Sequence, residues 1–171
     1  MISCSFENGS AAQLRHVCVN AIVVKDNQVL LGKRATFKGK KILEAGKWGL
    51  IGGFFERDEY LEDALRREVM EESGWEIDHL RLLRINDNPM RPMEDRQNVD
   101  MIFITEAKKK KGSPDEEISN LRWFRIDELP PKEMIAFDHW EHLFLYQKYL
   151  KNPFPLPTWG SIDRYISGYA S

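Results

Sequence analysis

Several features that would narrow the class of this protein are scarce or missing in its 171 residues. Only two cysteines occur, Cys4 and Cys18, so no disulfide framework is encoded and a reducing compartment such as the cytoplasm fits best. The first residues lack the basic and apolar segments of a signal peptide. The longest apolar run, Ala21 to Val24, is far shorter than the ~20 residues that span a bilayer. We therefore expect a soluble, cytoplasmic protein with no membrane partner.

A large charge of one sign is also lacking. Lysine and arginine together number 25, aspartate and glutamate number 27, and the formal net charge is −2. That balance argues against a protein that binds nucleic acid or anionic membranes through bulk charge. The lysine run from Lys108 to Lys111 is short and holds no aromatic residue, which favours a solvated loop over a nucleic-acid patch. With 42% hydrophobic and 30% charged residues, the composition is that of a globular chain with a buried core.

Strand and helix patterns are mixed along the chain, without an internal repeat or a Gly/Ser-rich linker. A hairpin is predicted from the β-branched residues 17–24, a turn at Asp26-Asn27 and a return strand from Val29. Further strands are predicted at 80–85, 99–105 and 121–126.

Two helices complete the predicted elements. The first runs from Asp58 to Ser73 with Gly74 as its C-cap, and the second from Pro131 to Leu150. Together these elements indicate one α/β domain over residues 1–152. An extended aromatic tail, 153–171, is expected to pack on this domain or on a partner chain.

The first predicted helix places carboxylates where a purely structural helix would carry apolar side chains. Its apolar stripe consists of Leu61, Ala64 and Leu65. About two turns later, the same face holds Glu68, Glu71 and Glu72. Like charges at this spacing repel, and partial burial adds to the cost. A positive counter-charge is therefore expected among the three glutamates.

Neighbouring side chains do not supply that counter-charge. From Asp58 to Glu72 the chain has seven acidic residues and two arginines, a local net charge of −5. Carboxylate oxygens without histidine or cysteine suit Mg²⁺ or Mn²⁺. A solvated acidic helix held by ion pairs is the alternative, and the helix alone does not decide between the two.

The residues before the helix favour the metal site. Gly52 and Gly53 end an apolar strand, where glycine lets the backbone approach a ligand and a free carbonyl could complete a metal site. Glu59 and Arg67 lie about two helical turns apart and could pair if the first turn bends. Arg67 would then orient carboxylates without touching the metal.

These positions together match a known motif. Gly53, Glu59, Arg67-Glu68-Val69, Glu71-Glu72 and Gly74 resemble the Nudix box, Gly-x5-Glu-x7-Arg-Glu-U-x-Glu-Glu-x-Gly-U, at every fixed position. Trp75 departs from the pattern at the last position, which is normally aliphatic. Ile51 stands where relatives often have the proline of Leu-Pro-Gly-Gly. The resemblance to the Nudix hydrolase family extends over roughly residues 15–150.

The resemblance implies an α/β Nudix fold, with a mixed sheet sandwiched between helices. It also implies metal-dependent hydrolysis of the phosphoanhydride bond in a nucleoside diphosphate linked to another moiety. Two or three Mg²⁺ or Mn²⁺ ions are expected with the substrate bound. By position, Glu68 and Glu72 would be the principal metal ligands, together with the backbone carbonyl of Gly52.

The remaining box residues receive supporting or catalytic roles from the same resemblance. Glu71 would be a further metal ligand or a base acting through water, and Glu59 with Arg67 would be the supporting pair. Many relatives add an acid from a later loop. Alignment of the downstream residues indicates Glu117 for this role, with Glu116 as the fallback.

Residues that bind the substrate are less constrained by the sequence. Candidates for phosphate or base contacts are Arg34, Lys47, Arg91, Arg96 and Phe54. Two of these lie in a 13-residue polar stretch from Asn86 to Asn98, which is long for a connection and typical of binding loops. The stretch from Trp48 to Glu59 and the Asp-Asn-Pro loop resemble, more weakly, the ADP-ribose pyrophosphatase-like branch.

Several functions stay open at this point. An ADP-ribose-like molecule or a nucleotide sugar is the leading substrate, and a house-cleaning nucleoside triphosphate pyrophosphatase is the second enzyme interpretation. Capped or triphosphorylated RNA is disfavoured by the nearly neutral charge. A non-catalytic nucleotide-sensing Nudix domain is the alternative from another class, although such sensors tend to lose box glutamates that are present here. The aromatic tail after Pro153 suggests a homodimer.

Overall fold

A mixed β-sheet forms the centre of the fold, as described by a computed structural model over residues 2–91 and 97–160. Its strands are β3 (Val17–Lys25), β4 (Gln28–Arg34), β7 (Trp48–Gly49), β8 (Ile51–Phe54), β9 (Trp75–Asn86), β10 (Val99–Lys110) and β11 (Ile118–Arg125). Five of them lie in the order β11-β4-β3-β10-β9, while β7 pairs with β4 and β8 with β3. The central β3 and β10 are parallel, whereas the other pairs in this sheet are antiparallel.

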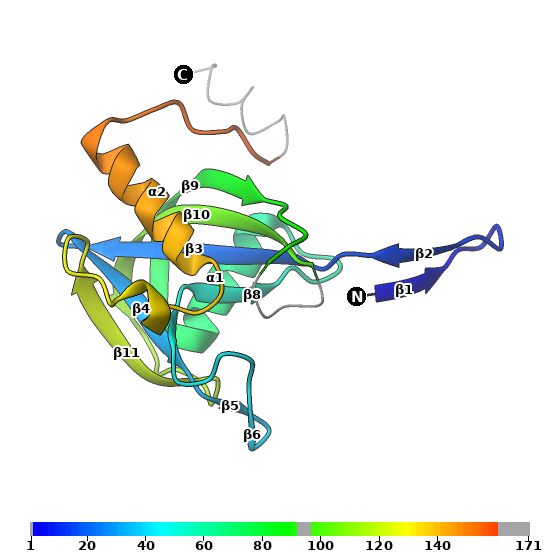
Figure 1. Cartoon of the computed structure of the whole chain (residues 1–171), viewed down its shortest axis with the longest axis horizontal. Coiled ribbons are helices and arrows are strands. Elements are labelled where there is room, and N and C mark those ends of the chain that lie inside the picture. The colour runs from blue at the N-terminus through cyan, green and yellow to red at the C-terminus, as the bar shows by residue number, and fades with distance from the viewer. Residues whose placement is uncertain (1, 92–96, 161–171) are drawn as a thin grey trace.

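Helices α1 (Leu61–Ser73) and α2 (His139–Lys151) cover opposite faces of this sheet (Figure 1). Successive residues of a strand point to opposite faces, and β3 follows that rule. Ala21 and Val23 belong to the buried cluster that includes Leu65 of α1, whereas Ile22 belongs to the cluster that includes Leu143 of α2. The predicted mixed sheet between helices is confirmed.

The predicted hairpin forms, but the three other predicted strands are longer than predicted, and β11 begins three residues early, at Ile118. Its turn at Asp26-Asn27 has φ angles of +49° and +61°, as the tight turns that join twisted antiparallel strands require. Strands β9 and β10 extend beyond 80–85 and 99–105 because their pairing continues to Trp75 and Lys110. Lys108 to Lys110 therefore belong to β10, and the expectation of a loop there is wrong.

Both helices begin later than predicted. The stretch before α2 contains a short 3₁₀ turn, η1 (Lys132–Met134), and Phe137 has a φ angle of +52°, which an α-helix does not accommodate. Helix α1 starts at Leu61, so Glu59 lies in the preceding loop and not on the helix. The C-cap is as predicted, since Gly74 has a φ angle of +70°.

Two short strand pairs lie outside the predicted elements. Strands β1 (Ile2–Ser5) and β2 (Ala11–Leu14) form an antiparallel ribbon that projects beyond the sheet (Figure 1). Strands β5 (Thr36–Phe37) and β6 (Lys40–Lys41) pair within the connection between β4 and β7.

The tail after α2 is described as far as Gly160, and this part packs on its own domain. Phe154 and Leu156 pack against the cluster on the α2 side, and the Trp159 ring lies 4.9 Å from that of Phe103. Residues 161–171 lie outside the described part, and the division at residue 152 stays a prediction. No helix in the described ranges is long and apolar enough to cross a membrane.

Candidate active site

The glutamates of helix α1 differ in burial, from the face that packs on the sheet to the edge that meets solvent. Ala64, Leu65 and Val69 are fully buried against the sheet. Further along the helix, Glu72 is 6% exposed and the Glu68 side chain 13%, whereas the Glu71 side chain is 52% exposed. The structure thus places Glu68 and Glu72 in the protein interior and Glu71 at its rim.

The end of β8 meets this acidic face directly. The Gly52 N–H donates a 2.9 Å hydrogen bond to Glu72 Oε2. At Gly53, a β-carbon would lie 2.5 Å from a carboxylate oxygen of Glu68. A side chain at this position would displace the Glu68 carboxylate, so glycine at position 53 allows that carboxylate to lie against the backbone.

Arg67 holds the carboxylates in position. Its guanidinium lies 2.9 Å from Glu59, 2.8 Å from Glu68 and 3.2 Å from Glu71, and it donates a 3.1 Å hydrogen bond to the Phe54 carbonyl. The hydrogen bond from Arg67 lowers the pKa of Glu59, which therefore stays ionised. The predicted Glu59–Arg67 pair forms across the loop and needs no bend in the helix.

A further carboxylate reaches the cluster from the loop before β11. Burial is the largest cause of a raised pKa at Glu68, Glu72 and Glu117. The pKa of Glu72 rises to about 8. Repulsion from Glu117 raises the pKa of both helix residues as well, so the three carboxylates share one electrostatic site. Glu116 faces elsewhere, because its carboxylate accepts a 2.9 Å hydrogen bond from the Lys38 N–H. The structure therefore brings Glu117, and not Glu116, to the cluster.

The loop that carries Glu117 is bonded to the end of α1. The Gly74 carbonyl accepts hydrogen bonds from the N–H groups of Lys111 at 2.7 Å and Gly112 at 3.1 Å. The Asp115 N–H donates to the Glu71 carbonyl at 3.1 Å. These bonds hold the loop and the helix end together.

The carboxylate cluster has the donor set of a divalent metal site. Its oxygens are hard ligands of the kind that Mg²⁺ and Mn²⁺ prefer. A pKa of about 8 for Glu72 means that its charge is poorly compensated in the protein alone, although Arg34 lowers that pKa somewhat. Bound cations would supply the missing positive charge, so the residues fit the expected ions.

A pocket of about 360 Å³ opens beside the Gly52-Gly53 strand end. Of the predicted substrate-binding residues, Arg34, Phe54 and Arg91 line it. Lys47 lies 2.7 Å from Glu44 and is not among the lining residues. Arg96 lies outside the described residues.

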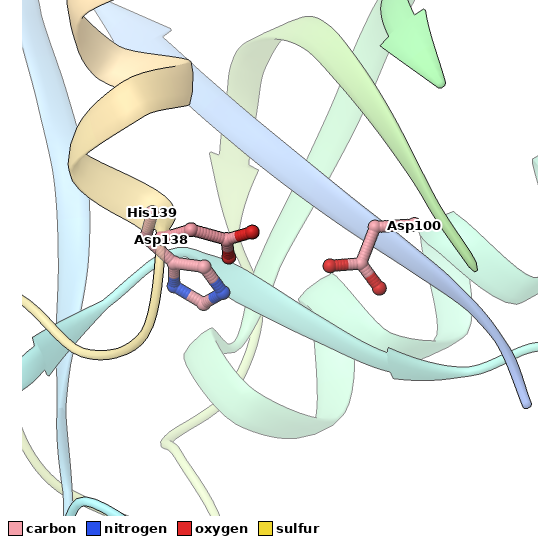
Figure 2. Close-up of side chains that lie close together, drawn as sticks. All are labelled: Asp100, Asp138 and His139. Carbon is pink, nitrogen blue, oxygen red and sulfur yellow. The ribbon is translucent and has the colours of Figure 1, made fainter. Parts of the chain in front are cut away.

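The pocket also reaches a buried polar cluster that the sequence analysis missed. Ligand atoms of Asp100, Asp138 and His139 lie within 4.8 Å of one another (Figure 2). Arg91 joins the two carboxylates, at 2.6 Å from Asp100 and 2.8 Å from Asp138. Burial would raise the pKa of Asp138, but Arg91 holds it below its usual value. Arg91 therefore compensates the charge of Asp138 and also pairs with Asp100, and we assign this cluster as an ion-pair network.

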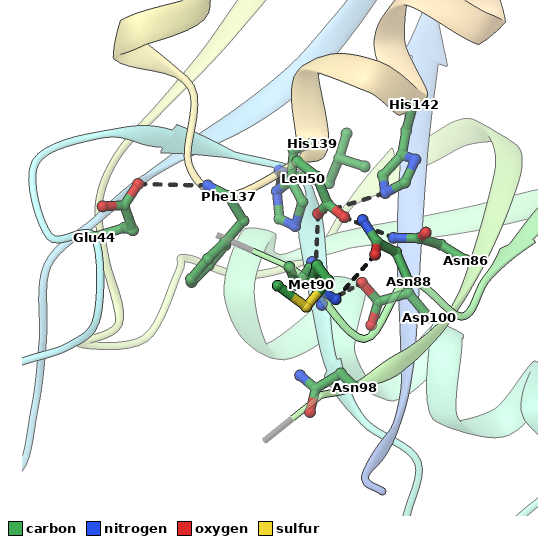
Figure 3. Close-up of polar contacts among 12 residues, drawn as sticks. Glu44, Leu50, Asn86, Asn88, Met90, Asn98, Asp100, Phe137, His139 and His142 are labelled. Atoms are coloured by element: carbon green, nitrogen blue, oxygen red, sulfur yellow. Dashed lines mark hydrogen bonds and ion pairs between the residues drawn. The ribbon is translucent and has the colours of Figure 1, made fainter. Parts of the chain in front are cut away.

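His139 of this cluster and the neighbouring His142 lie close to the two aspartates (Figure 3), and both are expected to be neutral at pH 7. Burial lowers the pKa of His139 well below its ordinary value and that of His142 to about 4. His139 Nδ1 accepts a 3.0 Å hydrogen bond from the Leu50 N–H, so its proton is on Nε2. His139 thus offers the pocket a hydrogen-bond donor, because it also lines that pocket. A charged residue within an apolar strand, Asp100, was the sequence signal for this network.

A mixed sheet between two helices, with a glycine-rich strand end against an acidic helix, defines an α/β domain built around a cluster of carboxylates. The chain belongs to the NUDIX domain family, whose family model matches residues 14–146.

Similar proteins support this assignment. The chain is 34% identical over 129 residues to the oxidized purine nucleoside triphosphate hydrolase of Danio rerio, covering 74% of this chain and 78% of that protein. It is 31% identical over 123 residues to the ADP-ribose pyrophosphatase of Methanocaldococcus jannaschii, covering 72% and 68%.

Two further similarities concern a longer relative and a solved structure. The chain is 30% identical over 115 residues to the NAD-capped RNA hydrolase NudC of Vibrio parahaemolyticus, covering 67% of this chain but only 40% of that protein. The crystal structure of a NUDIX hydrolase from Nitrosomonas europaea matches with a TM-score of 0.67 and 27% identity, covering 84% of this chain and 74% of the other.

Proposed function

We propose that this protein is a metal-dependent hydrolase that cleaves the phosphoanhydride bond of a nucleoside diphosphate linked to another moiety. The observation that carries the proposal is the cluster of Glu68, Glu72 and Glu117, three carboxylates with raised pKa values beside a pocket of about 360 Å³. Structural ion pairs in this chain, such as the one between Arg91 and Asp138, keep the carboxylate pKa low instead. Glu72 and Glu68 lie against Gly52 and Gly53, which line the pocket, and carboxylates with perturbed pKa values beside a cleft are typical of functional sites.

The residues of the site take complementary roles in this proposal. Glu68, Glu72 and Glu117 hold Mg²⁺ or Mn²⁺, with the backbone of Gly52 as a further candidate ligand. When bound, divalent ions neutralise the pyrophosphate and make water a better nucleophile. Arg67 positions the carboxylate of Glu68 and, through its bond to the Phe54 carbonyl, the end of β8.

A general base is also required, and two carboxylates are placed for it. Glu71 is at the solvent edge of the helix and Glu117 is on the loop opposite. Taking a proton from the attacking water is worth roughly 10²–10⁴ in rate. Either residue meets this need, and substitution distinguishes them.

Two neighbouring acids give a matched test of this assignment. We expect Glu117→Gln to lower kcat by about 10²-fold or more, whereas Glu116→Gln, which removes the same charge one residue away, leaves kcat within about twofold. Glu71→Gln made in parallel identifies the base through the pH profile of kcat. Equal losses in Glu116→Gln and Glu117→Gln would contradict the placement of Glu117 at the metal site.

The substrate is proposed to carry a nucleoside that enters the pocket beside Gly52 and Gly53. Arg34 and Phe54 line this pocket, and we propose that Arg34 contacts a phosphate and Phe54 the base. Arg91 is engaged with two buried carboxylates, so we propose that it shapes the pocket wall and that its contact with phosphate is secondary. ADP-ribose-like molecules and nucleotide sugars are the leading class, in keeping with the relative that is an ADP-ribose pyrophosphatase.

A nucleoside triphosphate pyrophosphatase is the second candidate, because a relative with 34% identity is an oxidized purine nucleoside triphosphate hydrolase. A panel of ADP-ribose, nucleotide sugars, NAD, dNTPs and oxidised dNTPs, each with Mg²⁺ and then Mn²⁺, decides between the two. Products are identified by chromatography, and ¹⁸O-labelled water shows which phosphorus is attacked. No turnover of any compound would favour the non-catalytic sensing domain instead.

We also propose a cellular location and an oligomeric state for this protein. Cys4 and Cys18 are not joined in a disulfide in the described structure, which is in keeping with the cytoplasmic location proposed here. A homodimer is also proposed. The tail that suggested it packs on its own domain as far as Gly160.

A further inference from the structure

The side chain of His139 holds a hydrogen-bond donor in the pocket wall. His139 is 4% exposed, and it lines the pocket beside Gly52 and Gly53. Its Nδ1 accepts a hydrogen bond from the neighbouring Leu50 N–H (Figure 3), and no group within residues 2–91 and 97–160 accepts one from Nε2–H. A buried donor without an acceptor costs free energy, so such groups are rare in folded proteins. A ligand that accepts this hydrogen bond would therefore bind favourably.

Nε2 of His139 can donate a hydrogen bond but not accept one. A neutral imidazole carries one proton, and the Leu50 N–H already occupies the lone pair of Nδ1. Moving the proton to Nδ1 would set two N–H groups against each other inside the protein. The tautomer is thus fixed by the backbone, and only an acceptor atom of a ligand makes a good contact at this point of the pocket.

The position of the His139 ring is fixed as well. The Ala136 N–H donates a 2.8 Å hydrogen bond to the Trp48 carbonyl, which holds the start of α2 against β7. A β-carbon on Gly49 would lie 3.3 Å from His139 Nδ1, so glycine lets the ring pack closely on this strand. Phe137, two residues before His139, has a φ angle of +52°, which is an outlier for a bulky residue. Backbone strain of this kind is concentrated at functional sites.

His139 faces the part of the substrate that lies away from the phosphates. It belongs to α2, whereas the glutamates proposed to hold the metal ions belong to α1 on the opposite face of the sheet (Figure 1). Other lining side chains, among them Leu50, Phe54 and Phe137, are apolar or aromatic. Such a wall suits a planar base, and a neutral donor suits an uncharged ring nitrogen better than a phosphate oxygen.

We propose that His139 recognises the base of the substrate by donating a hydrogen bond from Nε2 to a ring nitrogen of adenine. This inference rests on the proposed function, because it concerns the nucleoside that enters the same pocket. The N1, N3 and N7 atoms of adenine all accept hydrogen bonds. Guanine carries a hydrogen on N1, and a purine oxidised at C8 carries one on N7. Either N–H, placed against Nε2–H, would leave two donors unpaired, so the fixed donor favours adenine among the purines.

Titration calorimetry with AMP tests this contact on the full chain in Mg²⁺. The 1-deaza, 3-deaza and 7-deaza analogues of AMP each replace one ring nitrogen by a C–H group. We expect the wild type to bind one of them about 10-fold more weakly than AMP. His139→Phe retains a ring without a donor and is expected to bind AMP and that analogue equally, as is His139→Leu, made in case the larger ring disturbs the fold. His139→Gln retains a donor and should recover part of the difference.

His142→Phe is the matched control, because His142 is the second buried histidine of α2 and is not among the pocket-lining residues. It should keep the 10-fold difference. A wild type that does not bind AMP or that binds all three analogues as well as AMP would overturn the inference, and so would a difference that persists in both donor-free variants. AMP has no phosphoanhydride bond, so the calorimetry does not depend on hydrolysis. Base discrimination without turnover of any substrate would contradict the proposed function alone, and turnover without discrimination would contradict this inference alone.

Discussion

Replacing Glu72 by glutamine should stabilise the metal-free protein and strongly weaken its response to metal. The carboxyl is 6% exposed, and its pKa rises from 4.5 to about 8, mainly through burial. Each pKa unit corresponds to about 1.4 kcal/mol, so the interval from 4.5 to about 8 sets an upper limit of about 5 kcal/mol. Relaxation around the charge reduces this, and we expect a gain of about 2–5 kcal/mol in the free energy of unfolding at about pH 8.

The direction of the expected change follows from how the free energy of unfolding depends on pH. Because the folded protein binds a proton more tightly than the unfolded chain, the contribution of Glu72 to stability falls as pH rises from 4.5 to about 8. The slope is at most about 1.4 kcal/mol per pH unit. Glu72→Gln lacks this slope, so the two proteins should be similar near pH 4.5 and diverge toward pH 8.

Urea unfolding in EDTA, measured across this pH range, is the assay, with Glu71→Gln as the control. Glu71 lies on the same helical turn, but its side chain is 52% exposed, so Glu71→Gln removes a negative charge without relieving a buried one and should not reproduce the gain of Glu72→Gln near pH 8. Adding Mg²⁺ at about 100 times its dissociation constant should stabilise the wild type by about 2.7 kcal/mol and Glu72→Gln by much less. Parallel pH curves for wild type and Glu72→Gln, or equal stabilisation by Mg²⁺, would refute the reasoning.

Three other substitutions have definite expected outcomes. Gly53→Ala places a methyl group 2.5 Å from the Glu68 carboxylate, so steady-state kinetics should show kcat lower by about 10²-fold with little change in Tm. Arg67→Met removes the group that holds this carboxylate, and titration calorimetry should show metal affinity reduced about 10–100-fold. Arg91→Met leaves buried carboxylates unpaired and should cost about 3–5 kcal/mol in urea unfolding, part of which Arg91→Met/Asp100→Asn should recover.

The sequence was most informative where the structure is local. The helix face that joins Leu65 to Glu72 depends on spacing within a few turns, and Gly74 ends the helix as its residue type predicts. The pair of Glu59 and Arg67 was predicted correctly, but its position was not. Both residues were expected on one helix, whereas Glu59 lies in the loop before α1.

The sequence patterns did not predict contacts between segments that are distant along the chain. Arg91, Asp100 and Asp138 come from a loop, a strand and the residue before α2, and only the folded sheet brings them together. No periodic signal relates positions so far apart. The ribbon was missed for another reason, since its serine, alanine and glutamine residues have little strand preference of their own.

Hydrogen bonds tie the Glu117 loop to the end of α1, and they affect how the sequence of such a protein can evolve. The acidic groups form one mechanical unit, built from α1, the β8 end and this loop. Apart from the β8 end, the pocket wall is drawn from other segments, among them those that carry Arg91 and His139. Mutations in that wall can therefore alter which molecule fits without moving the groups that break the bond. One hydrolytic unit can thus serve a succession of substrates, with selection acting on each half separately.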